Sequence, residues 1–182
     1  RAVSCRILVH AEIEIFIEDS AFALFDAGWR AWETNKVVNR VILGVLAYAG
    51  TTTVPPPAKL GGGTRNQMSY EDVAVPVQKA QSIWRSVHRE NHGIKEANIL
   101  ALFLPLGVPA DAFDSTLLAD LTSFGTSRGA VAHGSPLRVL GYADPKSEYE
   151  QAMALVASLG SIDELVQEGI REVGALHKAI TR

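Results

Sequence analysis

Between Val3 and Trp32, apolar residues recur every three or four positions, and acidic residues stand between them. That spacing gathers the apolar side chains on one face of a helix, so it predicts a single long helix. A second, strongly apolar segment covers residues 36–49 and predicts a helix that is buried on most sides. The β-branched residues of this segment leave a strand as the alternative there.

Residues 50–76 break the helical pattern with threonine, proline and glycine, including the runs Thr51-Thr52-Thr53, Pro55-Pro56-Pro57 and Gly61-Gly62-Gly63. Such a composition favours extended or mobile backbone over a helix. We therefore expect residues 50–76 to form one long, flexible Pro/Gly-rich loop inserted in the domain. A loop of this length is often either mobile or functional.

Helical spacing returns after this loop. We expect one helix over residues 77–91 and another over residues 94–106. A further helix begins where Asp114 or Ser115 caps it, and it runs toward residues 128–133.

The end of the chain predicts two more helices. The first has Asp144 as its cap and Pro145 at its first position, and it reaches Gly160. The second begins at Ser161, with Glu164 completing a capping box. Because no strand alternation interrupts these helices, the sequence predicts an all-α fold. The expected architecture is an antiparallel helical bundle with extra helices, formed as a single domain over residues 1–182.

The composition fits a globular chain that has no global attraction for polyanions. Hydrophobic residues make up 47% and charged residues 20% of the 182 residues, which is close to the average for folded domains. The net charge is -3 and the sequence pI is near 6.0, so a nucleic-acid partner would need a local basic patch.

Cysteine content and hydropathy limit the kinds of site and the cellular location that we expect. Cys5 is the only cysteine, which excludes an intramolecular disulfide and a zinc site built on cysteine pairs. A cytoplasmic location therefore fits best. Charged residues interrupt every apolar stretch before it reaches the roughly 18 residues that a membrane span needs, so we expect no membrane segment.

Candidate chemistry is concentrated in the segment from Ser127 to Gly134, where small residues surround Arg128 and His133. Arginine is permanently charged and binds phosphate oxygens with two donors, whereas histidine titrates near neutrality and exchanges protons. Together they suit phosphodiester chemistry. On a straight helix, five residues amount to about 140° of rotation, so a shared face requires a helix end or a distortion at Gly129 or Gly134. The alternative is structural: a histidine that caps carbonyls at a helix end and an arginine paired with a nearby acid.

The order of these features resembles the HEPN superfamily, in particular its RiboL-PSP-HEPN-like group. The resemblance is carried by a long opening helix with the acidic and aromatic stretch at residues 11–19. It continues through residues 98–108 and 117–121 and ends on an Arg-x4-6-His motif, here Arg128 and His133. It covers most of the chain outside residues 50–76, and the Arg-His motif is its specific part.

The resemblance implies a helical bundle that dimerises so that two Arg-His pairs face one composite cleft. The implied activity is that of a metal-independent endoribonuclease without a cofactor, in which the ribose 2′-OH attacks its own phosphate. His133 would act as general base or acid, and Arg128 would stabilise the transition-state charge. Such proteins often act as toxins or in defence against phage, so the implied partners are RNA, a second copy of the chain and an antitoxin. The rival hypothesis is a non-catalytic helical module for dimerisation or partner binding.

Two further groups of residues are candidates for supporting roles. Glu14 and Glu18 are four apart on one helix face, and with Ser127 they are candidates to support the Arg-His pair, for instance through a salt bridge to Arg128. No histidine completes a metal site with these acids. The other group is a basic, stacking surface for RNA or, alternatively, a solvated helix face. Its members are Arg85, Arg89 and Lys95, with His88 and His92 beside them and Trp84 as the stacking ring.

Overall fold

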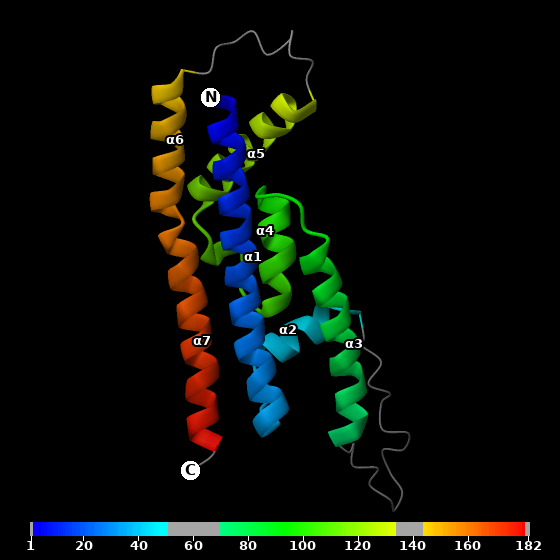
Figure 1. The fold of residues 1–182 in the computed structure, drawn as a ribbon. Coiled ribbons are helices and arrows are strands. Elements are labelled where there is room, and N and C mark those ends of the chain that lie inside the picture. The colour runs from blue at the N-terminus through cyan, green and yellow to red at the C-terminus, as the bar shows by residue number, and fades with distance from the viewer. Residues whose placement is uncertain (1, 51–69, 134–143, 181–182) are drawn as a thin grey trace, which may run out of the picture.

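The computed structural model describes the backbone of residues 2–50, 70–133 and 144–180, and the side chains of residues 4–50, 73–127 and 144–176. Within this part of the chain every regular element is helical and no strand is present (Figure 1). The elements, in chain order, are α1 (Ala2–Asn35), α2 (Arg40–Tyr48), α3 (Tyr70–Arg89), α4 (Glu96–Phe103), the 3-10 turns η1 (Leu104–Leu106) and η2 (Ala110–Ala112), α5 (Ser115–His133), α6 (Pro145–Ser158) and α7 (Gly160–Ile180). The prediction of an all-α helical bundle is confirmed.

Helix α1 is the axis of the molecule. It has 34 residues, which corresponds to a length of about 50 Å, and it confirms the long helix predicted from the apolar spacing. It ends at Asn35, and the next residue, Lys36, has a left-handed φ of 58°. The Lys36 N–H donates to the Trp32 carbonyl at 2.9 Å and the Val37 N–H donates to the Ala31 carbonyl at 3.4 Å. This pair of bonds turns the chain sharply toward α2.

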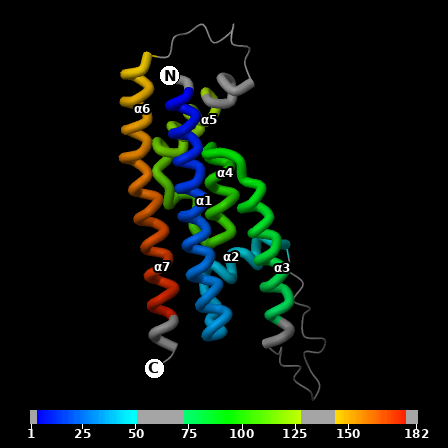
Figure 2. Tube along the Cα trace, in the orientation of Figure 1, coloured from blue at the N-terminus to red at the C-terminus, as the bar shows by residue number. Residues whose placement is uncertain are grey.

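Helices α6 and α7 lie along one side of α1 and run in the same direction as α1 (Figure 2). Near the start of α1 and of α6, Arg6 Nε donates to Glu148 Oε2 at 2.7 Å, and Arg6 Nη2 donates to Glu148 Oε1. Farther along, Leu24 packs where a side chain on Gly169 would otherwise stand. The antiparallel order expected from the sequence therefore does not extend to this pair. The physical reason is that α5 ends at the same end of the molecule at which α6 begins.

The break between α6 and α7 lies at Leu159, slightly earlier than the predicted boundary at Gly160 and Ser161. Asp144 caps α6 as expected, because its carboxylate accepts from the backbone N–H groups of Lys146 and Ser147. The capping box expected at Ser161 is wrong. Helix α7 already begins at Gly160, and the Ser161 hydroxyl donates to the Ser158 carbonyl at 2.9 Å. Only Leu159 separates the two helices, so no free helix start is left to cap.

Helices α3 and α4 cover the other side of α1, α5 crosses behind the first part of α1, and these three helices alternate in direction (Figure 1). Asp114 caps α5, since its Oδ1 accepts from the Thr116 N–H at 2.7 Å and from the Leu117 N–H at 3.4 Å. The buried apolar side chains form one cluster that joins the two sides of α1. Its largest fully buried members are Trp84, Phe25, Phe103, Phe124, Ile13 and Ile17.

The boundaries predicted for the loop were too wide. Residues 51–69 lie outside the described part of the chain, but α3 begins at Tyr70 and includes Pro76. Val73 packs against the core, and Val77 and Ala80 are buried. This apolar stripe runs through the proline at helical spacing, so burial offsets the backbone hydrogen bond that Pro76 cannot make.

Helix α2 is also shorter than the segment 36–49 predicted. The buried Asn39 caps it, because Oδ1 accepts from the N–H groups of Val41 at 3.1 Å and Ile42 at 3.2 Å. The Asn39 amide donates in turn to the Gly28 carbonyl at 2.9 Å. Gly44 lets α2 approach the backbone of η1, since a Cβ there would overlap Pro105. These contacts position α2 across the end of the bundle.

Candidate functional site

The Arg-His motif occupies the C-terminal part of α5. Arg128 and His133 belong to this helix, and their side chains lie outside the described residues. Helix α5 is continuous from Ser115 to His133, so the two positions are about 140° apart around its axis. Ser127, the third predicted residue here, is half-buried, and its hydroxyl donates to the Ser123 carbonyl at 3.0 Å. That hydroxyl is therefore already engaged within its own helix.

A polar row on α1 lies beside this region. It consists of His10, Glu14 and Glu18, which are spaced four residues apart and follow one slanting line on the helix. His10 is only 3% exposed, and its Nδ1 lies 3.5 Å from Glu14 Oε2. A buried imidazole backed by a carboxylate is held in one orientation and has a partner for its charged form.

The polar row reaches α5 through His10. A Cβ on Gly125 of α5 would lie 3.8 Å from Nε2 of His10, an ordinary van der Waals distance, so the His10 ring lies against α5 at this position. Gly125 precedes Arg128 by three residues, which places the two positions on the same side of α5. The prediction that Glu14 or Glu18 of α1 supports the motif stays a prediction, because the side chains of Arg128 and His133 are not among the described residues. The predicted salt bridge to Arg128 lies outside the described residues.

Glu18, at the other end of the polar row, is held by α3 and the turn that follows it. Its Oε1 accepts from the Asn91 amide at 2.9 Å, and Asn91 also donates to the Gly93 carbonyl at 3.2 Å. Asn98 of α4 donates to Asn91 Oδ1 at 3.1 Å. Asn91 is buried, so its full set of partners fixes the Glu18 carboxylate in place.

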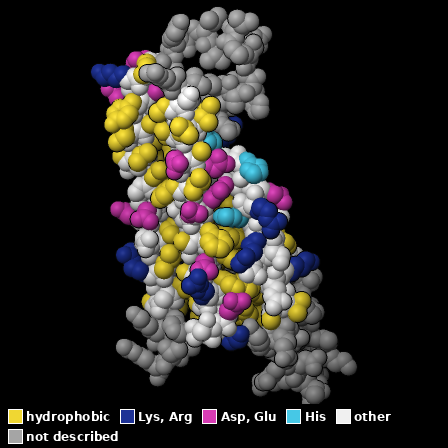
Figure 3. Space-filling view, viewed as in Figure 1, with side chains coloured by type: hydrophobic (Ala, Val, Ile, Leu, Met, Phe, Trp, Pro, Cys, Tyr) yellow, Lys and Arg dark blue, Asp and Glu magenta, His cyan; other side chains and the backbone are white. Residues whose placement is uncertain are grey.

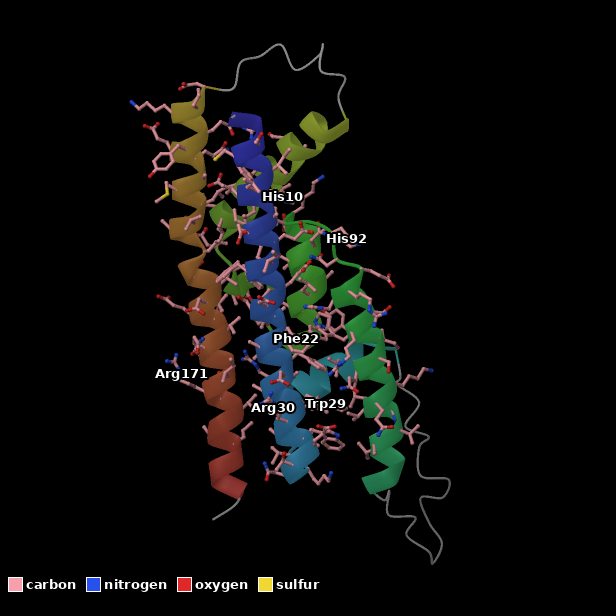
Figure 4. All side chains as sticks on the ribbon, viewed as in Figure 1. His10, Phe22, Trp29, Arg30, His92 and Arg171 are labelled. Atoms are coloured by element: carbon pink, nitrogen blue, oxygen red, sulfur yellow. The ribbon has the colours of Figure 1, made fainter. Side chains whose placement is uncertain are left out.

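His88 of α3 contacts the same turn of α1. Its Nε2 lies 3.1 Å from the Glu18 carbonyl oxygen, and a carbonyl only accepts, so Nε2 carries the proton. The ring packs against Phe22, with centroids 5.6 Å apart. Phe22 is 38% exposed, and Figure 4 shows its side chain on α1 below His10, near α3. An aromatic surface is thus open to solvent beside a fixed carboxylate.

Five side chains line a shallow cavity between α1 and α3, here called the α1–α3 cavity. Its volume is about 350 Å³, and it is lined by Glu18, Phe22, Arg85, His88 and Arg89. Arg85 and Arg89 are exposed, and no carboxylate among the described residues lies within salt-bridge distance of either of them. In Figure 3, basic side chains lie on α3 beside the acidic and histidine side chains of the centre.

The structure corrects the stacking role predicted for Trp84. This ring is 2% exposed and stacks on Phe25 with centroids 4.2 Å apart. Its Nε1–H donates to the Leu102 carbonyl at 3.0 Å. Trp84 is therefore a core residue, because the apolar face of α3 points toward α1, and the open aromatic ring in this region is Phe22.

The predicted basic residues fall into two places. Arg85 and Arg89 share the α1–α3 cavity, and Arg85 lies 5.7 Å from the centre of the Phe25 ring. Lys95 is exposed at the start of α4, beside Gly125 of α5. Lys95 thus lies against α5, the helix that carries the Arg-His motif, and does not line the α1–α3 cavity.

Sequence reasoning missed His10, Phe22 and Asn91. The four-residue spacing from His10 to Glu14 and Glu18 was a usable signal, because it places three polar residues along one line of the helix. Phe22 and Asn91 gave no such signal, since their roles depend on which helix packs against α1.

Among the described residues, no group of histidine, cysteine and acidic side chains is arranged to hold a metal ion. None of the described helices is long and apolar enough to cross a membrane. No protein-family model, curated protein sequence or solved structure matches this chain.

Proposed function

We propose that this chain is a metal-independent endoribonuclease of the HEPN type that acts as a homodimer. The observation that carries the proposal is the Arg128-x4-His133 motif at the end of α5, next to the buried His10–Glu14 pair of α1. A permanent cation, a titratable imidazole and an oriented acid-imidazole pair are the groups that phosphodiester transesterification uses.

In this proposal the ribose 2′-OH attacks the adjacent phosphate, and the 5′-oxygen of the next nucleotide leaves. His133 takes the proton from the 2′-OH or gives one to the leaving oxygen, and Arg128 binds the phosphate oxygens as negative charge develops. The products are a 2′,3′-cyclic phosphate and a 5′-OH end. Because one continuous helix separates the two positions by about 140°, a second copy of the chain completes the cleft.

The α1–α3 cavity supports RNA as the substrate. Arg85 and Arg89 supply cations that have no carboxylate partner among the described residues, and Phe22 supplies an exposed ring. Single-stranded RNA is commonly bound by such a combination of cations and stacking platforms. With a single cysteine and this activity, we propose a cytoplasmic toxin or phage-defence effector, which an antitoxin would hold inactive.

The test is cleavage of a mixed RNA pool in EDTA by the wild type, Arg128→Ala and His133→Ala, with the end groups identified by enzymatic labelling. We expect cyclic-phosphate ends from the wild type and loss of cleavage in both folded variants. Arg30→Ala is the matched control, since it removes an exposed arginine whose carboxylate partner is Asp26, far along α1. No wild-type cleavage, or equal cleavage by all variants, would overturn the proposal.

The second candidate function is a non-catalytic helical module for dimerisation or partner binding. It is favoured by an apolar groove between α1 and α6, lined by Leu8, Val9, Glu12, Ile13, Phe16, Val156 and Leu159. Leu8 is 65% exposed there. This function predicts a dimer or complex in sedimentation together with an uncut RNA pool.

A further inference from the structure

We propose that the α1–α3 cavity is a base-recognition subsite for guanine in single-stranded RNA. The inference rests on the proposed ribonuclease function for its biological meaning, but the binding itself needs no cleavage. The proposal rests on an arrangement of side chains: a fixed carboxylate, an exposed aromatic ring and two arginines surround one cavity of about 350 Å³.

Glu18 selects the base. Its Oε1 is held by Asn91 at 2.9 Å, and no donor among the described side chains reaches its Oε2. An ionised carboxylate only accepts hydrogen bonds. The Watson–Crick edge of guanine presents two adjacent donors, N1–H and the N2 amino group, which match the two oxygens of a carboxylate. Adenine, cytosine and uracil each place an acceptor beside their donor, so the carboxylate repels one position of their edge.

Phe22 and His88 form the platform for the base. The two rings are 5.6 Å apart and tilted by 51°, and Phe22 is 38% exposed. The hydrogen bond from His88 Nε2 to the Glu18 carbonyl holds the imidazole against α1. Stacking on a fixed aromatic ring contributes to the binding of any base, so the platform supplies affinity and Glu18 supplies the choice among bases.

Arg85 and Arg89 bind the phosphate of the same nucleotide. They are four residues apart on α3, which puts both guanidinium groups on one helix face above the cavity. A phosphate alone would be repelled by Glu18. The mixture of one acid and two arginines therefore fits a ligand with a donor edge at one end and an anion at the other, as a nucleotide has.

The subsite is separate from the proposed cleavage centre. Glu18 follows His10 by two turns of α1, a rise of about 12 Å, and His10 is the member of the polar row that reaches α5. The nucleotide in the α1–α3 cavity is therefore a neighbour of the scissile one, and it sets which RNA sequences are presented to Arg128 and His133.

The experiment measures binding of short 2′-O-methyl RNA oligonucleotides, which cannot be cleaved through a 2′-OH, to the full chain by fluorescence anisotropy. The oligonucleotides carry a single central guanosine, inosine or adenosine in a uridine background. We expect guanosine to bind about tenfold more tightly than adenosine, with inosine between them because it lacks the N2 amino group. In Glu18→Gln the preference for guanosine disappears, while Asp19→Asn, which removes an exposed acid at the next position, retains it.

Two further variants separate the parts of the subsite. Phe22→Ala weakens binding of all the oligonucleotides by a similar factor, and Arg85→Ala with Arg89→Ala weakens them in a salt-dependent way. Circular dichroism checks that each variant is folded. Equal binding of guanosine and adenosine by the wild type, or a preference that survives Glu18→Gln, overturns the subsite whatever the RNA pool shows. Guanosine-selective binding with an uncut RNA pool leaves the subsite standing and overturns the ribonuclease.

Discussion

The two long sides of α1 carry different chemistry. The side that faces α6 and α7 is mostly apolar, apart from the Arg6–Glu148 ion pair, and it carries the open groove that includes Leu8, Phe16 and Val156. The side that faces α3, α4 and α5 carries the polar row and the α1–α3 cavity. In Figure 3, hydrophobic side chains gather over α6 and the first half of α1, whereas acidic, histidine and basic side chains follow one another from α1 onto α3.

The difference shows how one helix can serve both stability and binding. The burial of apolar side chains between α1 and the parallel helices α6 and α7 is non-directional, so it tolerates small displacements of one helix against another. The polar side depends on specific partners: Asn91 has to hold Glu18, and Glu14 has to hold His10. Substitutions on the first side should therefore lower stability, and those on the second should alter ligand binding more than stability.

The largest expected effect comes from Leu24→Ala on the apolar side. Leu24 is fully buried where α1 meets Gly169 of α7, and truncation there lowers the free energy of unfolding by about 4 kcal/mol through lost burial and a cavity. Chemical denaturation followed by circular dichroism measures the loss. Binding of the guanosine oligonucleotide per folded molecule stays at the wild-type value. Reduced binding by the folded fraction would show that the apolar side of α1 also affects ligand binding.

Glu148→Ala should be the next in size. It removes one partner of the ion pair that joins the first turns of α1 and α6, and Arg6 is left with a side chain only 17% exposed. A charge that loses its partner in such a place costs about 3 kcal/mol. The matched control is Lys146→Ala, which breaks the exposed Lys146–Glu150 pair one residue into α6 and should leave the denaturation curve unchanged.

Asn91→Ala tests the polar side. It removes the amide that holds Glu18 Oε1 and leaves the Asn98 amide without its acceptor, at a cost of about 1.5 kcal/mol in unfolding free energy. The released Glu18 carboxylate is no longer fixed, so the preference for guanosine over adenosine falls severalfold. Anisotropy titrations at a temperature where the variant is fully folded measure the fall, and an unchanged preference would show that Asn91 does not position Glu18.

Met153→Gln should have the smallest effect. Met153 is 50% exposed on α6, so the substitution removes little buried apolar area and changes the unfolding free energy by less than about 0.5 kcal/mol. Neither oligonucleotide binding nor RNA cleavage changes. A loss of stability comparable to that of Leu24→Ala would mean that this face of α6 is covered, and sedimentation of the variant would then reveal a weakened oligomer.

The sequence by itself determined which parts of the chain form helices and where two of the helices begin. The spacing of apolar residues gave α1, and side-chain caps gave the starts of α5 at Asp114 and of α6 at Asp144, because both signals act within a few residues. It also singled out Arg128 and His133 through residue chemistry and a family resemblance, with Glu14, Glu18, Arg85 and Arg89 as further candidates.

Only the tertiary structure decided which of these residues share a site. Pro76 lies inside α3 because Val73 and Val77 find a core to pack against, and Trp84 is buried because α3 turns that face toward Phe25. The parallel arrangement of α1 with α6 and α7 likewise depends on where α5 ends. These outcomes depend on contacts between residues far apart in the chain, and the spacing of apolar residues within one helix does not reveal such contacts.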